Sequence, residues 1–380
     1  MLTPERIVHY LIERGYVSLE TVVDGDFLVV DYRRRNRNFQ VICRKHPGLF
    51  VKQVQSMEPE PISTLQREAN CYWLAHTQPA LAPLARMMPK LVGYDPARHV
   101  LAIELLDGAE TLSEYHRRVG RLPESVTAEL GELLGSYHRG LGAWIMESQY
   151  RPLFPQVIPW ILSFHKMRPE FFRPLSAGNA RLLELVQSYP AFHEALDTLR
   201  GEWRVNGLVH GDMKWENCLI QTGLVHRDPG TAQNGGHAGA TLKLVDWEMA
   251  DLGDVCWDVG ALLQSFLVFW ILSLPLAGQV EPARLIDMAQ HPLNNMQPAI
   301  RGFWRGYSAA MSLDAGSAKD LLLRCVRFSG ARMIQSAFEC LYFAPEVTPQ
   351  AICLLQVSLN ILQDPAGATE SLLGIRRSNA

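Results

Sequence analysis

The chain has 380 residues, of which 48% are hydrophobic and 20% are charged, so it contains enough apolar side chains for a large core and is not a disordered protein. Its length fits two domains, or two lobes of one unit, at about 150 residues per domain. The formal net charge of −3 provides no general attraction to nucleic acid or to an anionic membrane, so we expect no nucleic-acid partner.

The seven cysteines form no CxxC motif and no metal-binding spacing with histidine, which is typical of a reduced protein with buried thiols and predicts a cytoplasmic location. The first residues, MLTPERIVHYLIERG, lack the uninterrupted apolar core of a signal peptide. They predict instead a helix with Thr3 as its N-cap, Pro4 at its first position and Gly15 at its end.

Three strand-like segments follow, FLVVDYR, FQVICR and LFVKQV, and they predict a three-stranded antiparallel meander. A helix is predicted at 62–75, and two further strands are predicted in KLVGY and HVLAIELL, on either side of the turn DPAR. These elements together predict a small lobe over 1–106 with five antiparallel strands and one internal helix.

A large, mainly helical lobe is predicted over 107–380. Helical spacing is present through 110–205 and again from 258 to the end. Between these regions lie two short strands, CLIQT and LKLVD, and a linker that predicts a hairpin loop with solvated histidines, His226 and His237.

One segment, ALLQSFLVFWILSLPLA at 261–277, has no charged residue and approaches the length that spans a bilayer. Polar residues and Pro275 interrupt it, its flanks carry no Lys or Arg, and an acidic stretch precedes it. We therefore predict a buried helix of the large lobe and no membrane span.

The segment LVHGDMKWENCLI, at 208–220, places polar residues between two apolar runs, which predicts a loop held between strands. Asp212 on this loop is a candidate general base, and Asn217 offers a neutral oxygen ligand. The strand LKLVD ends at Asp246, and Glu248 follows it. Oxygen donors of this kind suit a hard cation such as Mg²⁺, and a carboxylate beside them suits the deprotonation of a hydroxyl during phosphoryl transfer.

The two motifs VHGDMKWENCLI and LKLVDWEMADLGDVCWDVG resemble the catalytic core of the aminoglycoside phosphotransferase and choline kinase family, relatives of the protein kinases. The resemblance implies an α+β, bilobal, protein-kinase-like fold with ATP and Mg²⁺ in the cleft between the lobes. It implies Asp212 as the catalytic base, Asn217 and Asp246 as metal ligands, and Asp258 as the residue that braces the catalytic loop. It also implies a further contact by Glu248, either to the ligands of the first metal ion or to a second metal ion.

Lys52 lies in the apolar strand LFVKQV, where a lysine is unfavourable unless its ammonium group meets an anion. Glu68 is predicted on the inward face of the helix that follows. The pair resembles the lysine that holds the α- and β-phosphates in kinases and the glutamate that holds this lysine. The alternative is a lysine at the edge of the lobe and a solvated glutamate.

The passage AIELLDG is similar to the segment between the lobes in this family. The resemblance implies that the backbone of Glu104 and Leu106 binds adenine, and that Leu105 or Leu106 packs on its face. The first hairpin carries RRRNRN at 33–38 where protein kinases have a glycine-rich loop. These residues either contact phosphate or an acidic acceptor, or form a solvated turn.

Lys214 departs from the family, in which histidine is common at this position, and DMKWEN resembles the DLKPEN motif of Ser/Thr protein kinases. A lysine here can neutralise the γ-phosphate as it moves to an alcohol oxygen. It favours a plain hydroxyl acceptor, including Ser or Thr of a peptide precursor, although no activation segment for gripping a protein substrate follows. The acceptor therefore stays open between a small molecule, such as an antibiotic, a sugar or an amino alcohol, and a peptide.

A cationic small molecule would require acidic residues in the large lobe, and the candidates are Glu132, Glu170, Glu194, Asp251 and Asp254. Tryptophans near the motifs either line an acceptor pocket or cap the core, and the core is favoured; they are Trp203, Trp215, Trp247 and Trp257. His138 is predicted to be structural.

The sequence thus predicts an ATP-dependent O-phosphotransferase. A pseudokinase that acts as a nucleotide-binding interaction module is the alternative, and it is disfavoured by the joint presence of Lys52, Glu68, Asp212, Asn217 and Asp246. No oligomeric state is predicted.

Overall fold

The computed structural model describes residues 1–33, 36–172, 174–222, 240–276 and 282–376. The linker with His226 and His237 lies outside these ranges, as do Arg34 and Arg35 of the predicted basic hairpin. The chain divides into two compact units. The first unit comprises Met1–Leu112, Pro152–Phe154 and Glu216–Ala250, and the second comprises Ser113–Arg151, Pro155–Trp215 and Asp251–Ala380. The predicted lobe boundary near residue 106 stays a prediction.

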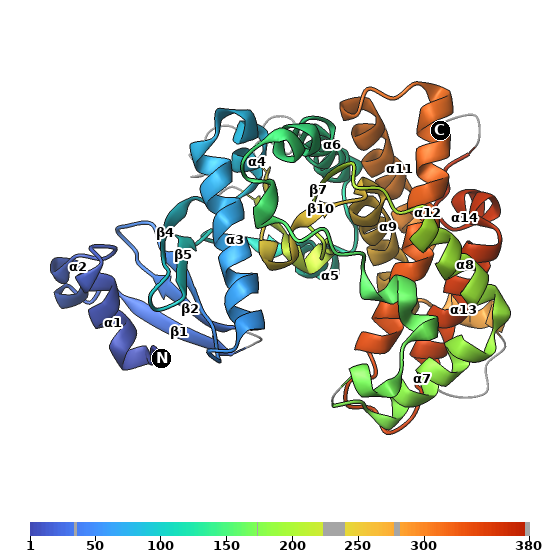
Figure 1. Cartoon of the computed structure of the whole chain (residues 1–380), viewed down its shortest axis with the longest axis horizontal. Coiled ribbons are helices and arrows are strands. Elements are labelled where there is room, and N and C mark those ends of the chain that lie inside the picture. The colour runs from blue at the N-terminus through green and yellow to red at the C-terminus, as the bar shows by residue number, and fades with distance from the viewer. Residues whose placement is uncertain (34–35, 173, 223–239, 277–281, 377–380) are drawn as a thin grey trace. The chain divides into compact units, whose positions relative to one another are not determined.

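The first unit is built on a five-stranded antiparallel sheet in the order β1-β2-β3-β5-β4 (Figure 1). Its strands are Leu28–Arg33 (β1), Arg37–Ile42 (β2), Leu49–Gln53 (β3), Leu91–Asp95 (β4) and Val100–Glu104 (β5). The first three strands pair in sequence and form the predicted meander. β3 then pairs with β5, so the strand that carries Lys52 has neighbours on both sides.

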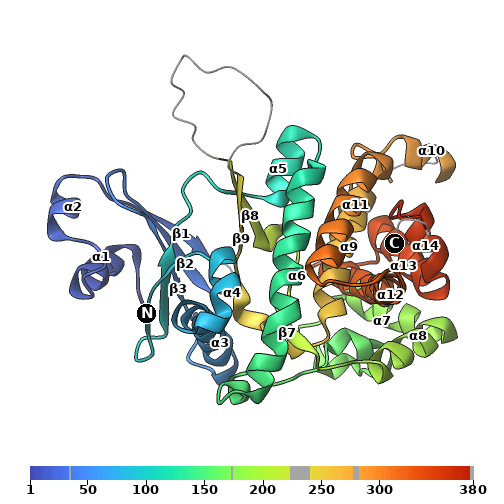
Figure 2. The ribbon, with the colours of Figure 1, turned by 90° about the horizontal axis from the view of Figure 1, so that it is seen from above.

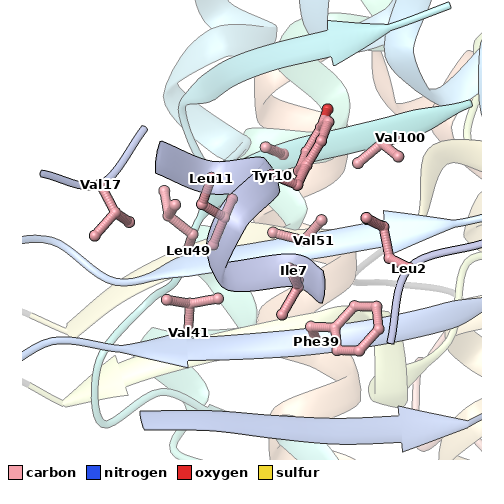
Figure 3. Close-up of a cluster of buried hydrophobic side chains, with 11 residues drawn as sticks. Leu2, Ile7, Tyr10, Leu11, Val17, Phe39, Val41, Leu49, Val51 and Val100 are labelled. Carbon is pink, nitrogen blue, oxygen red and sulfur yellow. The ribbon is translucent and has the colours of Figure 1, made fainter. Parts of the chain in front are cut away.

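Helix α1 (Pro4–Glu13) covers one face of this sheet. It begins as predicted, because the Thr3 hydroxyl accepts a hydrogen bond from the Arg6 N–H at 3.3 Å. Its buried side chains, Ile7, Tyr10 and Leu11, pack on the sheet in a cluster that includes Leu49 and Val51 of β3 (Figure 3). Since side chains alternate between the two faces of a strand, Lys52 points to the opposite face.

Helix α3 (Pro59–Thr77) lies on that opposite face and is longer than the helix predicted at 62–75. Pro59 and Pro61 are tolerated in its first turn, where backbone N–H groups have no partner within the helix. The unit also contains the short helices α2 (Leu19–Val23), η1 (Pro79–Leu81) and α4 (Ala82–Met87). These were not predicted, because segments of three to six residues are too short to show a helical period.

The first unit also includes a three-stranded sheet of β6 (Glu110–Thr111), β8 (Cys218–Thr222) and β9 (Ala240–Leu244), in the order β6-β8-β9. β8 and β9 are the strands predicted in CLIQT and LKLVD, and they pair antiparallel with Cys218 opposite Leu244. The short 3₁₀ helices η5 (Trp215–Asn217) and η6 (Trp247–Met249) lie at the ends of this hairpin.

The second unit is mainly helical, as predicted. Its α-helices are α5 (Leu112–Val119), α6 (Glu124–Glu147), α7 (Ala177–Ser188), α8 (Pro190–Gly201), α9 (Val255–Leu272), α10 (Pro282–Asp287), α11 (Leu293–Ala310), α12 (Ala315–Glu339), α13 (Pro349–Gln363) and α14 (Pro365–Ser371). Two short strands, β7 (Gly207–Val209) and β10 (Asp251–Gly253), pair antiparallel, and the candidate catalytic loop directly follows β7 in the chain.

The prediction of regular helices throughout 110–205 is wrong for the described residues of 148–176. This stretch forms the 3₁₀ helices η2 (Arg151–Leu153), η3 (Trp160–Lys166) and η4 (Pro169–Phe171). Prolines interrupt it repeatedly and remove the backbone N–H groups that an α-helix requires; they are Pro152, Pro155, Pro159, Pro169 and Pro174.

Helices α6 and α11 lie side by side in the second unit (Figure 2). A Cβ atom at Gly131 would lie 2.1 Å from the Phe303 carbonyl oxygen, so a larger residue there would force the helices apart. On the same helix pair, His138 Nδ1 lies 3.0 Å from the Tyr307 hydroxyl. The His138 side chain is buried, which agrees with its predicted structural role.

Helix α9 contains 261–272 of the apolar segment that is predicted to be a buried helix, and it ends at Leu272, before Pro275. Among the described residues it is the one helix long and apolar enough to cross a membrane, and 83% of this 18-residue window is buried inside the protein. Burial of this extent is typical of a core helix. All seven cysteines are free thiols. The cytoplasmic location stays a prediction.

Candidate active site

A charged cluster lies on the α3 side of the five-stranded sheet. Lys52 Nζ lies 2.8 and 2.9 Å from the two carboxylate oxygens of Glu68 and 2.6 Å from Asp246 Oδ1. The Lys52 and Glu68 side chains are 7% and 0% exposed, whereas Asp246 is 37% exposed. The ion pair between Lys52 and Glu68 is therefore present, and the alternative of a solvated glutamate is wrong.

Burial and neighbouring charges have opposite effects on the pKa values of Lys52 and Glu68 in this cluster. Burial lowers the pKa of Lys52, but the charges of Glu68 and Asp246 outweigh it and raise the pKa above its usual value. Burial raises the pKa of Glu68 to about 7 although the Lys52 ammonium lowers it. Lys52 therefore stays protonated and is shared between the buried carboxylate of Glu68 and the partly exposed carboxylate of Asp246.

The hairpin of β8 and β9 brings Asn217 and Asp246 to neighbouring positions in the first unit. Asn217 directly precedes β8, and its carbonyl oxygen accepts a hydrogen bond from the Val245 N–H at 3.0 Å. Asp246 has a φ of +70°, in the left-handed region that non-glycine residues rarely adopt. Strain of this kind is common at functional sites, where the surrounding structure maintains it.

Glu248 follows on η6 and is 8% exposed. Its Oε2 accepts a hydrogen bond from Asn36 Nδ2 at 3.2 Å, which links η6 to the first hairpin. This contact was not predicted, because the two residues are 212 positions apart. In the same hairpin, Arg37 pairs with Asp31 at 3.2 Å, so this member of the basic segment has an internal partner.

The side chains proposed as metal ligands offer an amide oxygen from Asn217 and carboxylate oxygens from Asp246 and Glu248. This donor set fits a hard cation that prefers oxygen. In the part of the chain that the structure describes, no group of three or more His, Cys, Asp or Glu side chains is arranged to hold a metal ion. A metal at these residues would therefore depend on the Asn217 amide as well as on the carboxylates.

The loop that carries Asp212 belongs to the second unit and is held by Asp258 in the first turn of α9. Asp258 Oδ2 accepts the His210 N–H at 2.6 Å, and Oδ1 accepts the Gly211 N–H at 3.1 Å. The Tyr137 hydroxyl donates to Oδ2 at 3.0 Å. The prediction that Asp258 braces this loop is confirmed.

Replacing Asp258 with Ala is expected to lower the free energy of unfolding by about 3–5 kcal/mol, because it leaves buried N–H groups without an acceptor. Burial raises the pKa of Asp258, but His138 and the backbone N–H groups hold it below its usual value, so the acceptor is a charged carboxylate. Chemical denaturation measures the change. The exposed Asp287 on α10 provides a control, since Asp287→Ala should unfold like the wild type. A loss below about 1 kcal/mol in Asp258→Ala would contradict the bracing role.

Two cations flank the Asp212 carboxylate. Lys214 Nζ lies 2.6 Å from Oδ2, and Arg332 Nη2 lies 3.4 Å from Oδ1. Lys214 is 37% exposed, whereas Arg332 is only 6% exposed. Sequence reasoning missed Arg332, because it lies on α12, 120 positions after Asp212, in no recognisable motif.

The tryptophans near the loop belong mainly to the core. Trp215, Trp247 and Trp257 are 1%, 0% and 2% exposed, and Trp203 is half-buried. Trp257, in the first turn of α9, donates from Nε1 to the Gly211 carbonyl oxygen at 2.9 Å and so supports the loop that carries Asp212. The interpretation that these residues cap the core is therefore favoured for the three buried ones.

His116 is buried beside Trp215, with ring centroids 5.6 Å apart, and beside His291, at 5.1 Å. Burial lowers the pKa of His116 to about 4, and the charges of His291 and Arg117 act in the same direction. Since the folded protein favours the neutral ring, it loses stability as the pH falls from the usual histidine pKa of 6.5 towards 4.

We expect His116 to make the protein about 2 kcal/mol less stable at pH 5 than at pH 7. The variant His116→Phe should lose this part of the pH dependence, as measured by denaturation at the two pH values. His9 is exposed, so His9→Gln should keep the wild-type profile. A profile in His116→Phe that matches the wild type would mean that His116 is not held neutral.

The residues predicted to bind adenine lie at the end of β5, which Glu104 closes, and directly after it. The N–H groups of Glu104 and Leu105 donate to the carbonyl oxygens of Lys90 and Gly48, each at 2.9 Å, and the Leu106 carbonyl oxygen accepts from Ala109 at 3.3 Å. The backbone N–H groups of Glu104 and Leu105 are thus used within the first unit. The roles of Glu104, Leu105 and Leu106 in adenine binding stay predictions.

Comparison with solved structures identifies the fold. A choline kinase from Cryptosporidium parvum matches with a TM-score of 0.54 at 10% identity, over 97% of this chain and 98% of that chain. The chain therefore has a bilobal kinase-like fold, as the sequence predicts.

Other kinase-like structures also match. A choline/ethanolamine kinase family protein from Mesorhizobium loti has a TM-score of 0.46 at 13% identity, over 97% of this chain and 96% of that chain. A macrolide 2′-phosphotransferase from Brachybacterium faecium has a TM-score of 0.46 at 15% identity, over 92% and 97%. No protein-family model and no curated protein matches the sequence.

Proposed function

We propose that the chain is an ATP- and Mg²⁺-dependent phosphotransferase that moves the γ-phosphoryl group to an acceptor hydroxyl. The observation that carries the proposal is the cluster in which Lys52 Nζ lies within 2.9 Å of both Glu68 and Asp246. A lysine held by a buried glutamate, next to a carboxylate at a strand end, is the arrangement that kinases use for nucleotide phosphates and metal. The fold shared with a choline kinase supports the same conclusion.

In this proposal Lys52 binds the nucleotide phosphates, and Glu68 fixes the position of its ammonium group. Asn217, Asp246 and Glu248 provide oxygen ligands for Mg²⁺, which when bound neutralises negative charge on the transferred phosphate. The backbone of Glu104 and Leu106 binds adenine. The predicted division into a small nucleotide-binding lobe and a large acceptor lobe belongs to the same proposal.

Asp212 orients the acceptor hydroxyl and takes its proton as the oxygen attacks the γ-phosphorus. The bond from this phosphorus to the β–γ bridging oxygen breaks, and the negative charge leaves on ADP. Lys214, which lies 2.6 Å from Asp212 Oδ2, balances charge on the moving phosphoryl group. Asp258 holds the loop, so that Asp212 keeps its orientation.

A small-molecule hydroxyl is the acceptor we favour, since a choline kinase is among the solved structures with the same fold. A Ser or Thr side chain of a peptide precursor is the second candidate, and the resemblance of DMKWEN to the protein-kinase motif favours it. A pseudokinase is disfavoured because the Lys52–Glu68–Asp246 cluster is intact.

The proposal is tested by incubating the protein with γ-labelled ATP, Mg²⁺ and a size-fractionated extract of the native cell. Label in the small-molecule fraction is expected, and it should be absent with Asp212→Asn. Label in the peptide fraction would establish the second candidate. No label in either fraction, with ATP still bound, would support the pseudokinase and overturn the proposal.

A further inference from the structure

Arg332 is a buried arginine whose hydrogen-bond donors are incompletely used. Nη1 donates to Gln335 Oε1 at 2.9 Å, and Nη2 lies 3.4 Å from Asp212 Oδ1, which is a long contact. The guanidinium carbon lies 5.1 Å from the ring centroid of Trp257. Arg332 Nε is buried and has no hydrogen-bond partner within the described part of the chain. A buried guanidinium with unused donors is unfavourable unless a ligand satisfies them.

One edge of the Arg332 guanidinium group has the geometry of a bidentate site. This edge carries Nε, which has no partner among the described residues, and Nη2, which makes only the long contact with Asp212 Oδ1. A carboxylate offers two oxygens at the spacing of such an edge. Arg332 is therefore arranged to bind an anion next to the proposed base.

The five acidic residues that the sequence offers for binding a cationic acceptor either have other partners or are exposed. Asp251 accepts hydrogen bonds from the N–H groups of Gln156 and Val157, each at 2.7 Å. Asp254 pairs with Arg324 at 2.6 Å and caps α9. The remaining candidates are exposed residues on the surface of the unit, namely Glu132, Glu170 and Glu194.

We propose that Arg332 determines acceptor specificity by binding an anionic group, such as a carboxylate, on the molecule whose hydroxyl Asp212 deprotonates. This inference rests on the proposed phosphotransferase function and narrows its substrate class to hydroxyl compounds with a negative charge. It separates the chain from kinases of cationic alcohols, although the fold is the same.

The test uses a low-molecular-mass extract of the native cell, separated by ion exchange into anionic, neutral and cationic fractions before the reaction. Each fraction is incubated with the full-length protein, γ-labelled ATP and Mg²⁺. We expect label to be transferred to a compound of the anionic fraction. Transfer confined to the neutral or cationic fraction would overturn the inference while leaving the proposed function intact.

The role of Arg332 is separated from a structural one by the variants Arg332→Lys and Arg332→Gln. With the active fraction as the source of acceptor, the acceptor concentration that gives half the maximal rate should rise at least about tenfold in both variants. The maximal rate of Arg332→Lys should fall less than about threefold. Arg327→Lys, also on α12, is the matched control, because Arg327 pairs with Glu202 at 2.8 Å and does not contact Asp212. Thermal unfolding establishes that each variant is folded.

If Arg332 has only a structural role, its replacement will lower the maximal rate and leave the half-saturating acceptor concentration unchanged. This result would overturn the inference about Arg332 but not the proposed function. If wild-type protein binds ATP but labels no fraction, the proposed function fails and the inference fails with it. The two failures are therefore distinguishable in one set of reactions.

Discussion

Replacing Asp212 with Asn is expected to reduce the rate of phosphoryl transfer by about a thousandfold and to change the affinity for ATP less than about twofold. The amide has the size of the carboxylate but takes no proton from an alcohol. It also leaves Lys214 and Arg332, at 2.6 and 3.4 Å from the carboxylate oxygens, beside a neutral group. Initial rates of label transfer and calorimetric titration with ATP measure the two effects separately.

Asp320 provides a matched control, because it is an exposed aspartate on α12 in the same unit. Asp320→Asn should transfer phosphate at the wild-type rate. If Asp212→Asn retained more than about a tenth of the wild-type rate, Asp212 would not be the base, since positioned general bases contribute about a hundredfold or more.

Replacing Lys52 with Met is expected to abolish transfer and to lower the free energy of unfolding by about 3–5 kcal/mol. The side chain of Glu68 is 0% exposed, so loss of the ammonium group leaves a carboxylate buried without its cation. Part of this cost should disappear at low pH, because burial raises the pKa of Glu68 and a proton can replace the missing charge. Denaturation at pH 7 and pH 5 measures the stability.

The double variant Lys52→Met with Glu68→Leu separates stability from function. It removes both members of the buried pair, so most of the lost stability should return, as in other buried ion pairs replaced by apolar residues. Transfer should stay absent, because the phosphates still lack their lysine. Restored transfer in the stable double variant would show that Lys52 supports the fold without binding phosphate.

Local patterns were sufficient to predict the elements that carry the site. The Thr3 cap and Pro4 fix the start of α1, and the alternation of LFVKQV places Lys52 on the face away from α1. An isolated lysine in an apolar strand must meet an anion, and Glu68 is predicted on the inward face of the next helix. These two features, together with the family resemblance, predicted the contact between Lys52 and Glu68. The Asp258 contacts were implied by the family resemblance, and the structure contains them.

Contacts between residues far apart in the chain could not be predicted, because no local sequence pattern indicates them. Arg332 and Asp212 are 120 positions apart, and Asn36 and Glu248 are 212 positions apart, so only the fold brings each pair together. A further failure concerned 148–176, where apolar residues occur at helical spacing but repeated prolines exclude α-helix. The roles of Glu104, Leu105 and Leu106 depend on a bound nucleotide, and they stay predictions.

The most direct test of the account is ³¹P NMR of the protein with ATP, Mg²⁺ and the active extract fraction. We predict that a phosphate monoester signal grows at the rate at which the γ-phosphate signal of ATP disappears, and that neither change occurs with Asp212→Asn. Formation of inorganic phosphate in place of a monoester would contradict transfer to an acceptor hydroxyl. An unchanged ATP spectrum with the wild-type protein would contradict catalysis altogether.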